Sequence, residues 1–290
     1  MSVVHPIVAV TGSSGAGTST LKQAFAAIFR RDGVKSVMID GDSFHRYDRK
    51  QMQAEVIKAE EKGQLLTHFG SKANCLSRLE LLLQTYAATG KGEKRHYIHD
   101  EAAGTKFHQA PGTFTPWQTF ADDSDLLFYS GLHGGIVTEQ VNIAQYVDLL
   151  IGVVPVINLE WIQKINRDCS NRGYSPEEVV DNILKRMPDY AHYITPQFSR
   201  THINFQRVPL IDTSNPFEAR DVPTPEQSLV VICFNGLVKA DLSHYLSRLQ
   251  NSFLSGANSI VVPEVEMELA MEIILTPLID DMMVKKRQRG

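Results

Sequence analysis

The sequence predicts an α/β protein built on a doubly wound, mostly parallel sheet with helices on both faces. Three observations support this fold class: an apolar run ends in a glycine-rich turn, a helical pattern follows the turn, and a second apolar run comes next. A strand, a helix and a strand in this order form a βαβ unit, which is typical of parallel sheets covered by helices. Further apolar runs alternate with helical patterns toward the C-terminus, so the same architecture is expected throughout.

The first such unit spans residues 7–40. Ile7 to Val10 is predicted to be a buried strand because it is short, apolar and rich in β-branched residues. The helix after the glycine-rich turn has one apolar face, which consists of Leu21, Phe25, Ile28 and Phe29. Ser36 to Asp40 then predicts the second strand.

The later elements follow from the same two patterns. Buried strands are expected at Leu126 to Tyr129, Leu149 to Val154, Leu229 to Phe234 and Ser259 to Pro263. Helices are expected over Leu76 to Tyr86, Leu159 to Arg172 and Met267 to Met283. Gly90 to Asp123 is expected to be irregular and to serve as an active-site loop or lid, because long loops in compact folds are usually functional or disordered. The basic ending KKRQRG is expected to fray, and residues 1–290 are expected to form a single domain.

Composition narrows the class of protein. The 29 Lys and Arg residues against 33 Asp and Glu residues give a net charge of −4, which argues against a dedicated nucleic-acid-binding protein. The three cysteines are too few and too dispersed for a disulfide framework or a metal-binding pattern, which indicates a reducing compartment. Neither a signal peptide nor a membrane span is recognisable, so a cytoplasmic protein without membrane partners is expected.

The glycine-rich turn matches a phosphate-binding pattern with one departure. GSSGAGTS, residues 12–19, has the spacing G-x-x-x-x-G-K-[ST], but Thr18 replaces the lysine. Glycines let backbone N–H groups surround phosphate oxygens, and Ser19 stands where a hydroxyl would bind Mg²⁺. The alternative is a turn that only caps a helix through Ser13 or Ser19, but the position between a strand and a helix favours nucleotide phosphate. The residues expected to bind ATP are Gly12, Ser13, Ser14, Gly15, Ala16, Gly17, Thr18, Ser19 and Thr20.

A second candidate site follows the second strand. Asp42 lies just past that strand, where ligand-binding groups of open α/β sheets gather, so it is a candidate general base. His45 and Arg49 come three and seven residues later, and one helical turn would place them on the same side. Two cationic groups beside a base suggest a substrate that carries its own phosphate. The alternative is that Asp42 caps a helix and Arg49 forms a surface ion pair.

Taken together, these segments resemble the proteobacterial phosphoribulokinases over nearly the whole chain. The resemblance rests on HPIVAVTGSSGAGTST (5–20), GDSFHR (41–46), PGTFTPW (111–117), GLHGG (131–135), GVVPVINLEWIQK (152–164), PQFSRTHINFQRVP (196–209), DTSNPF (212–217) and the pair Arg167 and Asp168. It implies a P-loop kinase-like fold with extra C-terminal strands and a helix, ATP and Mg²⁺ as cofactors, and a homo-oligomer. The implied reaction transfers the γ-phosphoryl group of ATP to the C1 hydroxyl of ribulose 5-phosphate.

The resemblance also implies roles for individual residues. It makes Asp42 the catalytic base, places Lys164 where the family compensates for the missing lysine of the phosphate loop, and makes Asp168 a second active-site carboxylate. It implies that Arg167 supports transition-state charge, that His45, Arg49, His99 and Arg172 bind the substrate, and that Ser19, Asp42 and Asp168 serve the metal. By spacing alone, Lys164 and Asp168 share a helix face and could form only a surface ion pair, whereas adjacent Arg167 and Asp168 are expected to point differently.

One departure from the family bears on activity. Ser130 stands where the family has glutamate at the end of a strand, and a serine hydroxyl attracts a hard cation less than a carboxylate does. Weakened Mg²⁺ affinity and a lowered rate are therefore expected. The alternatives to a ribulose 5-phosphate kinase are a nucleotide-binding regulatory paralogue with little or no turnover, and a kinase for another sugar phosphate or a nucleoside.

Overall fold

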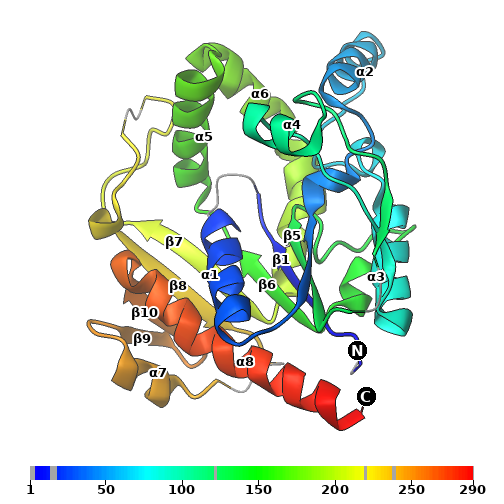
Figure 1. Ribbon diagram of the computed structural model, residues 1–290. Helices are drawn as coiled ribbons and strands as arrows, with labels where there is room; N and C mark the ends of the chain where they lie inside the picture. Colours follow the sequence, from blue (N-terminus) through cyan, green and yellow to red (C-terminus); the bar gives the residue numbers. More distant parts are fainter. Residues whose placement is uncertain (1–3, 14–17, 121–122, 219–220, 237–239, 290) are drawn as a thin grey trace.

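The computed structural model describes residues 4–13, 18–120, 123–218, 221–236 and 240–289, and these residues form one large sheet and one small one. The large sheet has the strand order β2-β5-β1-β6-β7-β8-β10-β9 (Figure 1). Its strands are β1 (Ile7–Thr11), β2 (Ser36–Asp40), β5 (Leu126–Gly131), β6 (Leu149–Val153), β7 (Ile203–Pro209), β8 (Ser228–Phe234), β9 (Phe253–Gly256) and β10 (Ser259–Pro263). The small sheet pairs β3 (Gly92–Lys94) with β4 (Gln118–Phe120) in antiparallel fashion.

The sheet is parallel from β2 to β7 and antiparallel beyond it. β1 pairs in parallel with both β5 and β6, and β6 pairs in parallel with β7. β8, β10 and β9 then add antiparallel strands at the far edge. Every residue of β1 and β6 is buried, as expected for parallel strands that are covered on both faces. The prediction of a mostly parallel sheet with extra C-terminal strands is confirmed.

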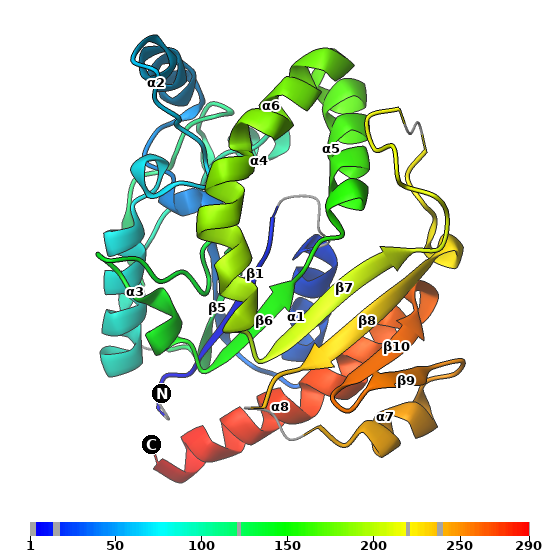
Figure 2. The same cartoon turned by 180° about the vertical axis from the view of Figure 1, so that it is seen from behind.

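Helices cover both faces of the sheet (Figures 1 and 2). On one face α1 (Thr18–Arg31), α7 (Leu242–Arg248) and α8 (Met267–Arg289) share a core with side chains of β1, β5, β6, β7, β8 and β10. On the other face α3 (Leu76–Thr89) packs against the alternate side chains of β1, β2 and β5. Phe25 of α1 packs against Phe128 of β5 with ring centroids 4.9 Å apart, which confirms the predicted apolar helix face. Among the described residues, none of the helices combines the length and apolar character needed to cross a bilayer.

Four helices stand above the edge of the sheet at which β1 ends (Figure 1). They are α2 (Arg49–Glu61), α4 (Glu101–Phe107), α5 (Ile157–Arg172) and α6 (Pro176–Asp189). α5 and α6 pack on each other through Ile165, Val179 and Ile183. Because the carboxyl ends of parallel strands meet at this edge, the helices surround the place where ligand-binding groups gather in such sheets.

Several elements escaped the sequence patterns. β7 alternates Ile203 and Phe205 with Asn204 and Gln206, so it lacks the continuous apolar run of a fully buried strand. α2 and α6 are largely polar, and in α2 only Met52 is buried. The segment at residues 90–123 was expected to be irregular, but it contains β3, α4 and β4; these elements are only three to seven residues long, too short for a clear period.

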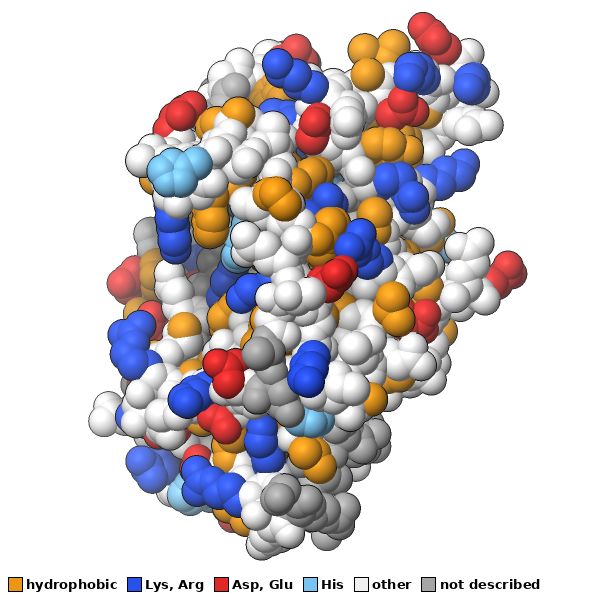
Figure 3. Space-filling model, turned by 45° about the vertical axis from the view of Figure 1, so that its right-hand side comes forward, with side chains coloured by type: hydrophobic (Ala, Val, Ile, Leu, Met, Phe, Trp, Pro, Cys, Tyr) orange, Lys and Arg blue, Asp and Glu red, His pale blue; other side chains and the backbone are white. Residues whose placement is uncertain are grey.

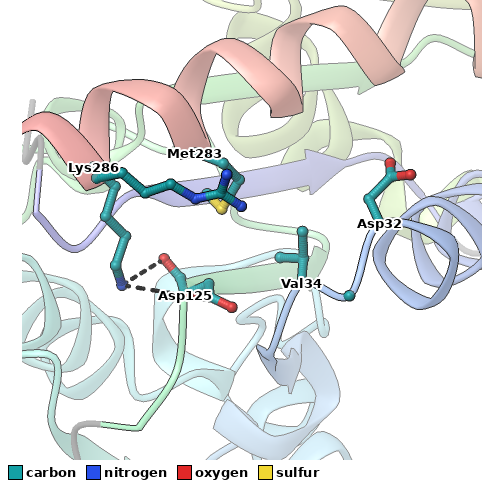
Figure 4. A pocket seen from close by; sticks show the side chains of 7 residues that line it. Asp32, Val34, Asp125, Met283 and Lys286 are labelled. Atoms are coloured by element: carbon teal, nitrogen blue, oxygen red, sulfur yellow. Dashed lines mark hydrogen bonds and ion pairs between the residues drawn. The ribbon is translucent and has the colours of Figure 1, made fainter.

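The C-terminal end of α8 is held against the sheet, contrary to the expectation of a frayed tail. Figure 4 shows Lys286 reaching the residue before β5, beside a cavity of about 240 Å³. Its Nζ donates to the backbone oxygens of Ser124 at 2.8 Å and Asp125 at 3.1 Å. These carbonyls lie outside the strand ladder, so the lysine satisfies acceptors that would otherwise need water.

We expect the substitution Lys286→Met to lower the free energy of unfolding by about 1–2 kcal/mol, because it removes two hydrogen bonds from a charged donor. Urea unfolding followed by circular dichroism measures the effect. Lys285→Met is the matched control: Lys285 is mostly exposed and, among the described residues, pairs with Asp281 one turn away, so it should change stability by less than about 0.5 kcal/mol. Equal effects of the two substitutions would contradict an anchoring role for Lys286.

Candidate active site

Asp42 lies in a single 3₁₀ turn, Gly41–Phe44, directly after β2. The turn begins because the carboxylate of Asp40 accepts a hydrogen bond from the backbone N–H of Asp42 at 3.3 Å. Gly41 is required here, since a Cβ at this position would come within 2.7 Å of the Cα of Gly131. The capping residue is therefore Asp40, so the alternative that Asp42 serves as a helix cap is wrong.

Two histidines flank the Asp42 carboxylate. Nε2 of His45 lies 3.4 Å from Oδ1, and Nε2 of His99 lies 3.5 Å from Oδ2. His45 is in the next turn of chain, whereas His99 comes from the segment at residues 90–123. The Asp42 side chain keeps 36% of its surface exposed, so a substrate can still reach it. The fold thus brings together three of the predicted site residues from two separate segments.

The surroundings of Asp42 favour its neutral form more than water does. Burial raises the pKa of the Asp42 carboxyl, the nearby Asp40 carboxylate raises it further, and His99 and His68 act in the opposite direction. Burial lowers the pKa of His45 to about 4, so that imidazole is neutral at neutral pH. A carboxylate whose pKa is raised is a stronger base, which suits proton abstraction near neutral pH.

Arg49 begins α2 and ties it to the segment that carries His99. Its Nη2 donates to the backbone oxygen of His99 at 3.1 Å, and its backbone N–H donates to the oxygen of Gly112 at 2.9 Å. Gly112 has φ +86° and packs so closely that a Cβ would come within 2.9 Å of Arg49. The alternative of a surface ion pair is not found for Arg49 within the part of the chain that is described; its partner there is a carbonyl.

The second cluster lies on α5. Nζ of Lys164 is 2.5 Å from Oδ2 of Asp168, and Nε of Arg167 is 2.9 Å from Oδ1. The expectation that Arg167 and Asp168 point in different directions is wrong, because the long arginine side chain curls back to its neighbour. The Lys164–Asp168 pair exists, but the Asp168 side chain is only 5% exposed, so it is a buried pair and not a surface one.

Burial and pairing compete in this cluster. Burial acts to raise the pKa of Asp168, but hydrogen bonds from Lys164 and Arg167 outweigh it and the pKa is lowered. Burial lowers the pKa of Lys164 despite the adjacent carboxylate. Asp168 is therefore ionised at neutral pH, and its two oxygens hold the two cations in place.

The phosphate loop is described only at its two ends. The backbone N–H of Gly12 donates to the oxygen of Gly131 at 3.3 Å, and Ser13 is buried beside it. Thr18 and Thr20 lie in the first turn of α1. The predicted contacts of Ser14, Gly15, Ala16 and Gly17 lie outside the described residues, as do the side chains of Ser19 and Arg172.

The sequence patterns missed two groups of residues at this site. Glu160, in the first turn of α5, is buried, faces Ser13 and accepts a hydrogen bond from the Tyr190 hydroxyl at 3.3 Å. Burial raises the pKa of Glu160. The only sequence signal for this is weak: Glu160 lies within the apolar run INLEW, which indicates a buried side chain.

The other missed group consists of two histidines. His68 and His133 lie close to His45, and the ring centroids of His45 and His68 are 4.4 Å apart. Burial lowers the pKa of His133 to about 4, and its Nε2 lies 2.9 Å from the backbone oxygen of Phe69. Residues 68 and 133 are far from each other and from Asp42 in the sequence, so no spacing pattern could have predicted that they meet. Figure 3 shows a recess on one face of the molecule with histidine and Lys or Arg side chains along its walls.

Metal ligands are not assembled in advance. Within the described residues, no three His, Cys, Asp or Glu side chains come together as a ready metal site. Mg²⁺ in nucleotide sites is typically held by one or two carboxylates together with phosphate oxygens and water, so such a cage is not required. The partly exposed carboxylate of Asp42 and the adjacent Asp40 at the end of β2 are oxygen ligands of the kind Mg²⁺ prefers.

A parallel sheet whose first strand is followed in the chain by a glycine-rich phosphate-binding pattern and then by a helix, with carboxylates at the same edge, defines the P-loop class of α/β proteins. The comparisons with known proteins narrow that class. The family model described as "Phosphoribulokinase / Uridine kinase family" matches residues 7–214. The chain belongs to this family.

Individual relatives are similar over their full length. The chain is 56% identical to "Phosphoribulokinase, chromosomal" of Cupriavidus necator over 289 residues, 99% of each chain. It is 54% identical to "Phosphoribulokinase" of Sinorhizobium medicae over 288 residues, again 99% of each. The solved structure "Phosphoribulokinase from Rhodobacter spheroides" superposes with a TM-score of 0.91 at 52% identity, covering 99% of this chain and 100% of that one. The predicted resemblance and fold class are confirmed.

Proposed function

We propose that this protein is an ATP-dependent kinase that transfers the γ-phosphoryl group to the C1 hydroxyl of ribulose 5-phosphate, giving ribulose 1,5-bisphosphate. The observation that carries the proposal is the Asp42 carboxylate, held between His45 and His99 at the end of β2 beside the phosphate loop. Full-length relatives at 56% and 54% identity bear the name phosphoribulokinase, which supports this acceptor. They do not favour the alternatives of a regulatory paralogue or a kinase for a nucleoside.

Asp42 removes the proton of the acceptor hydroxyl as that oxygen attacks the γ-phosphorus. The neutral imidazole of His45, together with His99, orients the carboxylate through contacts of 3.4 and 3.5 Å. Arg49 and Arg172 bind the phosphate that the sugar already carries, and Arg49 holds the His99 segment against α2. We propose that this segment, residues 90–123, forms one wall of the acceptor site.

Residues 12–20 bind the ATP phosphates through backbone N–H groups, as in other phosphate loops. Thr18 supplies no charge, so Lys164 and Arg167 approach the transferring group from α5. Asp168 positions both cations before ATP arrives. Its oxygens are already engaged, and binding Mg²⁺ would require it to exchange one of these partners.

Mg²⁺ would be held by Asp42 or Asp40 and by the Ser19 hydroxyl, together with phosphate oxygens. When bound, the ion neutralises charge on the β- and γ-phosphates. Because tight coordination would lower the basicity of Asp42, we assign the closer metal contact to the hydroxyl and the phosphates. Asp40 is already paired with Lys22 at 3.1 Å, and its negative charge would support the ion without direct coordination.

Ser130 gives the proposal its sharpest chain-specific test. It is buried in β5, in register with Asp40 on β2 and with Val10 on β1, so it presents a neutral hydroxyl beside the Asp40 carboxylate that we assign to the support of Mg²⁺. We expect Ser130→Glu to tighten Mg²⁺ binding about 10-fold, the scale on which outlying partners change metal affinity, and to raise the rate. Mg²⁺ titrations of turnover and of nucleotide binding measure both effects.

Ser130→Ala is the matched control for that substitution, since it removes the hydroxyl without adding charge. It should leave the Mg²⁺ dependence within about twofold of the native chain. Identical Mg²⁺ curves and rates for the native chain and Ser130→Glu would show that position 130 does not influence the metal.

The function itself is tested by ADP release with MgATP and each of three acceptors: ribulose 5-phosphate, fructose 6-phosphate and uridine. The proposal predicts robust turnover with ribulose 5-phosphate and little with the others. Thermal stabilisation by ATP without ADP release from any acceptor would instead identify a nucleotide-binding regulatory protein, because binding alone raises the melting temperature. Turnover with uridine alone would also contradict the proposal.

A further inference from the structure

His68 lies beside the candidate active site, and neither the fold nor the proposed reaction has so far given its side chain a role. It lies in the chain between α2 and α3, and its half-buried ring packs on that of His45 with centroids 4.4 Å apart and an interplanar angle of 36°. Its Nδ1 is enclosed and has no hydrogen-bond partner among the described residues. Buried polar atoms in native proteins nearly always have a partner, so an unpartnered one beside the candidate base requires an explanation.

The chain around His68 is firmly held, so the missing bond does not result from a loose loop. The Thr67 hydroxyl donates to Oδ2 of Asp189 at 2.7 Å, and Asn74 Nδ2 donates to the backbone oxygen of His68 at 2.8 Å. The backbone oxygen of Phe69 contacts Nε2 of His133 at 2.9 Å. The polar groups before and after His68 in the chain therefore have hydrogen-bond partners, whereas Nδ1 of its imidazole has none among the described residues.

We propose that His68 is a substrate-binding residue, in which one ring nitrogen hydrogen-bonds a hydroxyl of the sugar-phosphate acceptor next to the hydroxyl that Asp42 deprotonates. This inference rests on the proposed function. The His68 ring packs on that of His45, and Nε2 of His45 lies 3.4 Å from the Asp42 carboxylate, so His68 stands next to the candidate base. A half-turn about the Cβ–Cγ bond exchanges the ring edge that carries Nδ1 with the edge that carries Nε2, so either nitrogen can be the one that bonds the hydroxyl.

The charge on His68 decides between a hydroxyl and a phosphate as its partner. Burial lowers the pKa of His68 to about 3, and the neighbouring His45 and Arg186 lower it further, whereas Asp42 acts in the opposite direction. The ring is therefore neutral at neutral pH and offers one N–H donor and one acceptor. A neutral donor and acceptor pair suits a sugar hydroxyl, whereas the dianionic phosphate is better served by arginine.

Steady-state kinetics of three variants test the proposal. His68→Phe keeps a ring to pack on His45 but removes both nitrogens, and we expect KM for ribulose 5-phosphate to rise about 10-fold while KM for ATP stays within about twofold. His68→Asn places a polar atom near the position of Nδ1, and His68→Gln places one near Nε2. One of the two should recover most of the lost acceptor affinity, and the one that does so identifies the nitrogen.

The control is His244→Phe, an exposed histidine on α7, which should leave both KM values unchanged. An unchanged KM for ribulose 5-phosphate in His68→Phe overturns the inference. Equal losses for ATP and acceptor with a lowered melting temperature, or rescue by neither Asn nor Gln, assign His68 a structural role and overturn it as well. If the native chain does not turn over ribulose 5-phosphate, the proposed function itself is contradicted, and this result is distinct from a failure of the His68 variants to behave as expected.

Discussion

Replacing Asp42 with asparagine is expected to lower kcat by about 10³-fold, within the range that a positioned general base contributes. The amide keeps the shape of the side chain and its contacts with His45 and His99, but it cannot accept the proton of the acceptor hydroxyl. ATP binding should persist, because Asp42 lies outside the phosphate loop. Single-turnover ADP formation and nucleotide binding, measured on the same preparation, separate the two effects.

Unlike kcat, the stability of the Asp42→Asn variant against unfolding should not fall. Burial and Asp40 raise the pKa of Asp42, so the folded protein disfavours its charged form relative to the unfolded chain. Stability is therefore lost as the pH rises through the unfolded and then the folded pKa of this carboxyl. Removing the charge with Asp42→Asn should leave the unfolding midpoint at neutral pH unchanged or raised.

Asp281→Asn, at an exposed position of α8, serves as the control and should change neither kcat nor the midpoint appreciably. A kcat for Asp42→Asn within tenfold of the native value would mean that Asp42 is not the base. A midpoint that falls by several degrees would show that its charged form is favoured in the fold.

Replacing Lys164 with methionine is expected to lower kcat by about 10²–10³-fold, the scale of removing one electrostatic contact to a transition state. Thr18 provides no cation in the phosphate loop, so a larger share of the stabilisation depends on α5. Arg167 remains to pair with Asp168 at 2.9 Å, and the carboxylate is not left alone. The fold should therefore survive with a reduced melting temperature, whereas the chemical step slows.

Lys185→Met is the matched control, because Lys185 is exposed on α6 and its ion-pair partners in the described part of the chain are the surface carboxylates of Glu60 and Asp181. It should leave kcat within twofold. If Lys164→Met loses stability but keeps its kcat, the lysine belongs to a structural ion pair and the transferring phosphoryl group is stabilised by other residues. Thermal unfolding and kcat measured together distinguish these results.

The local sequence already specified much of the protein. Continuous apolar runs predicted β1, β5 and β6, because strands buried on both faces leave little room for polar residues. Short, mainly apolar stretches also predicted β2, β8 and β10, although alternate residues of β2 and β8 are only partly buried. The spacing of glycines in GSSGAGTS, between a predicted strand and a predicted helix, also predicted a phosphate loop from neighbouring residues alone. β7 and α2 were not predictable in this way, since each buries only part of its surface and reads as polar.

In the candidate site, too, some residues are brought together by local sequence and others only by tertiary structure. Asp42 and His45 are three residues apart in the chain, so their contact follows from local geometry, whereas Arg49 begins a separate helix and the expected single helical turn through all three is not formed. His99, His68 and His133 reach Asp42 and His45 only because separate segments fold back on the same sheet edge. The sequence alone also left Lys164 and Asp168 as an ordinary surface pair, since spacing cannot report burial. Tertiary packing around α5, which includes α6, leaves the two side chains only 17% and 5% exposed, and charges interact more strongly in such surroundings than in water.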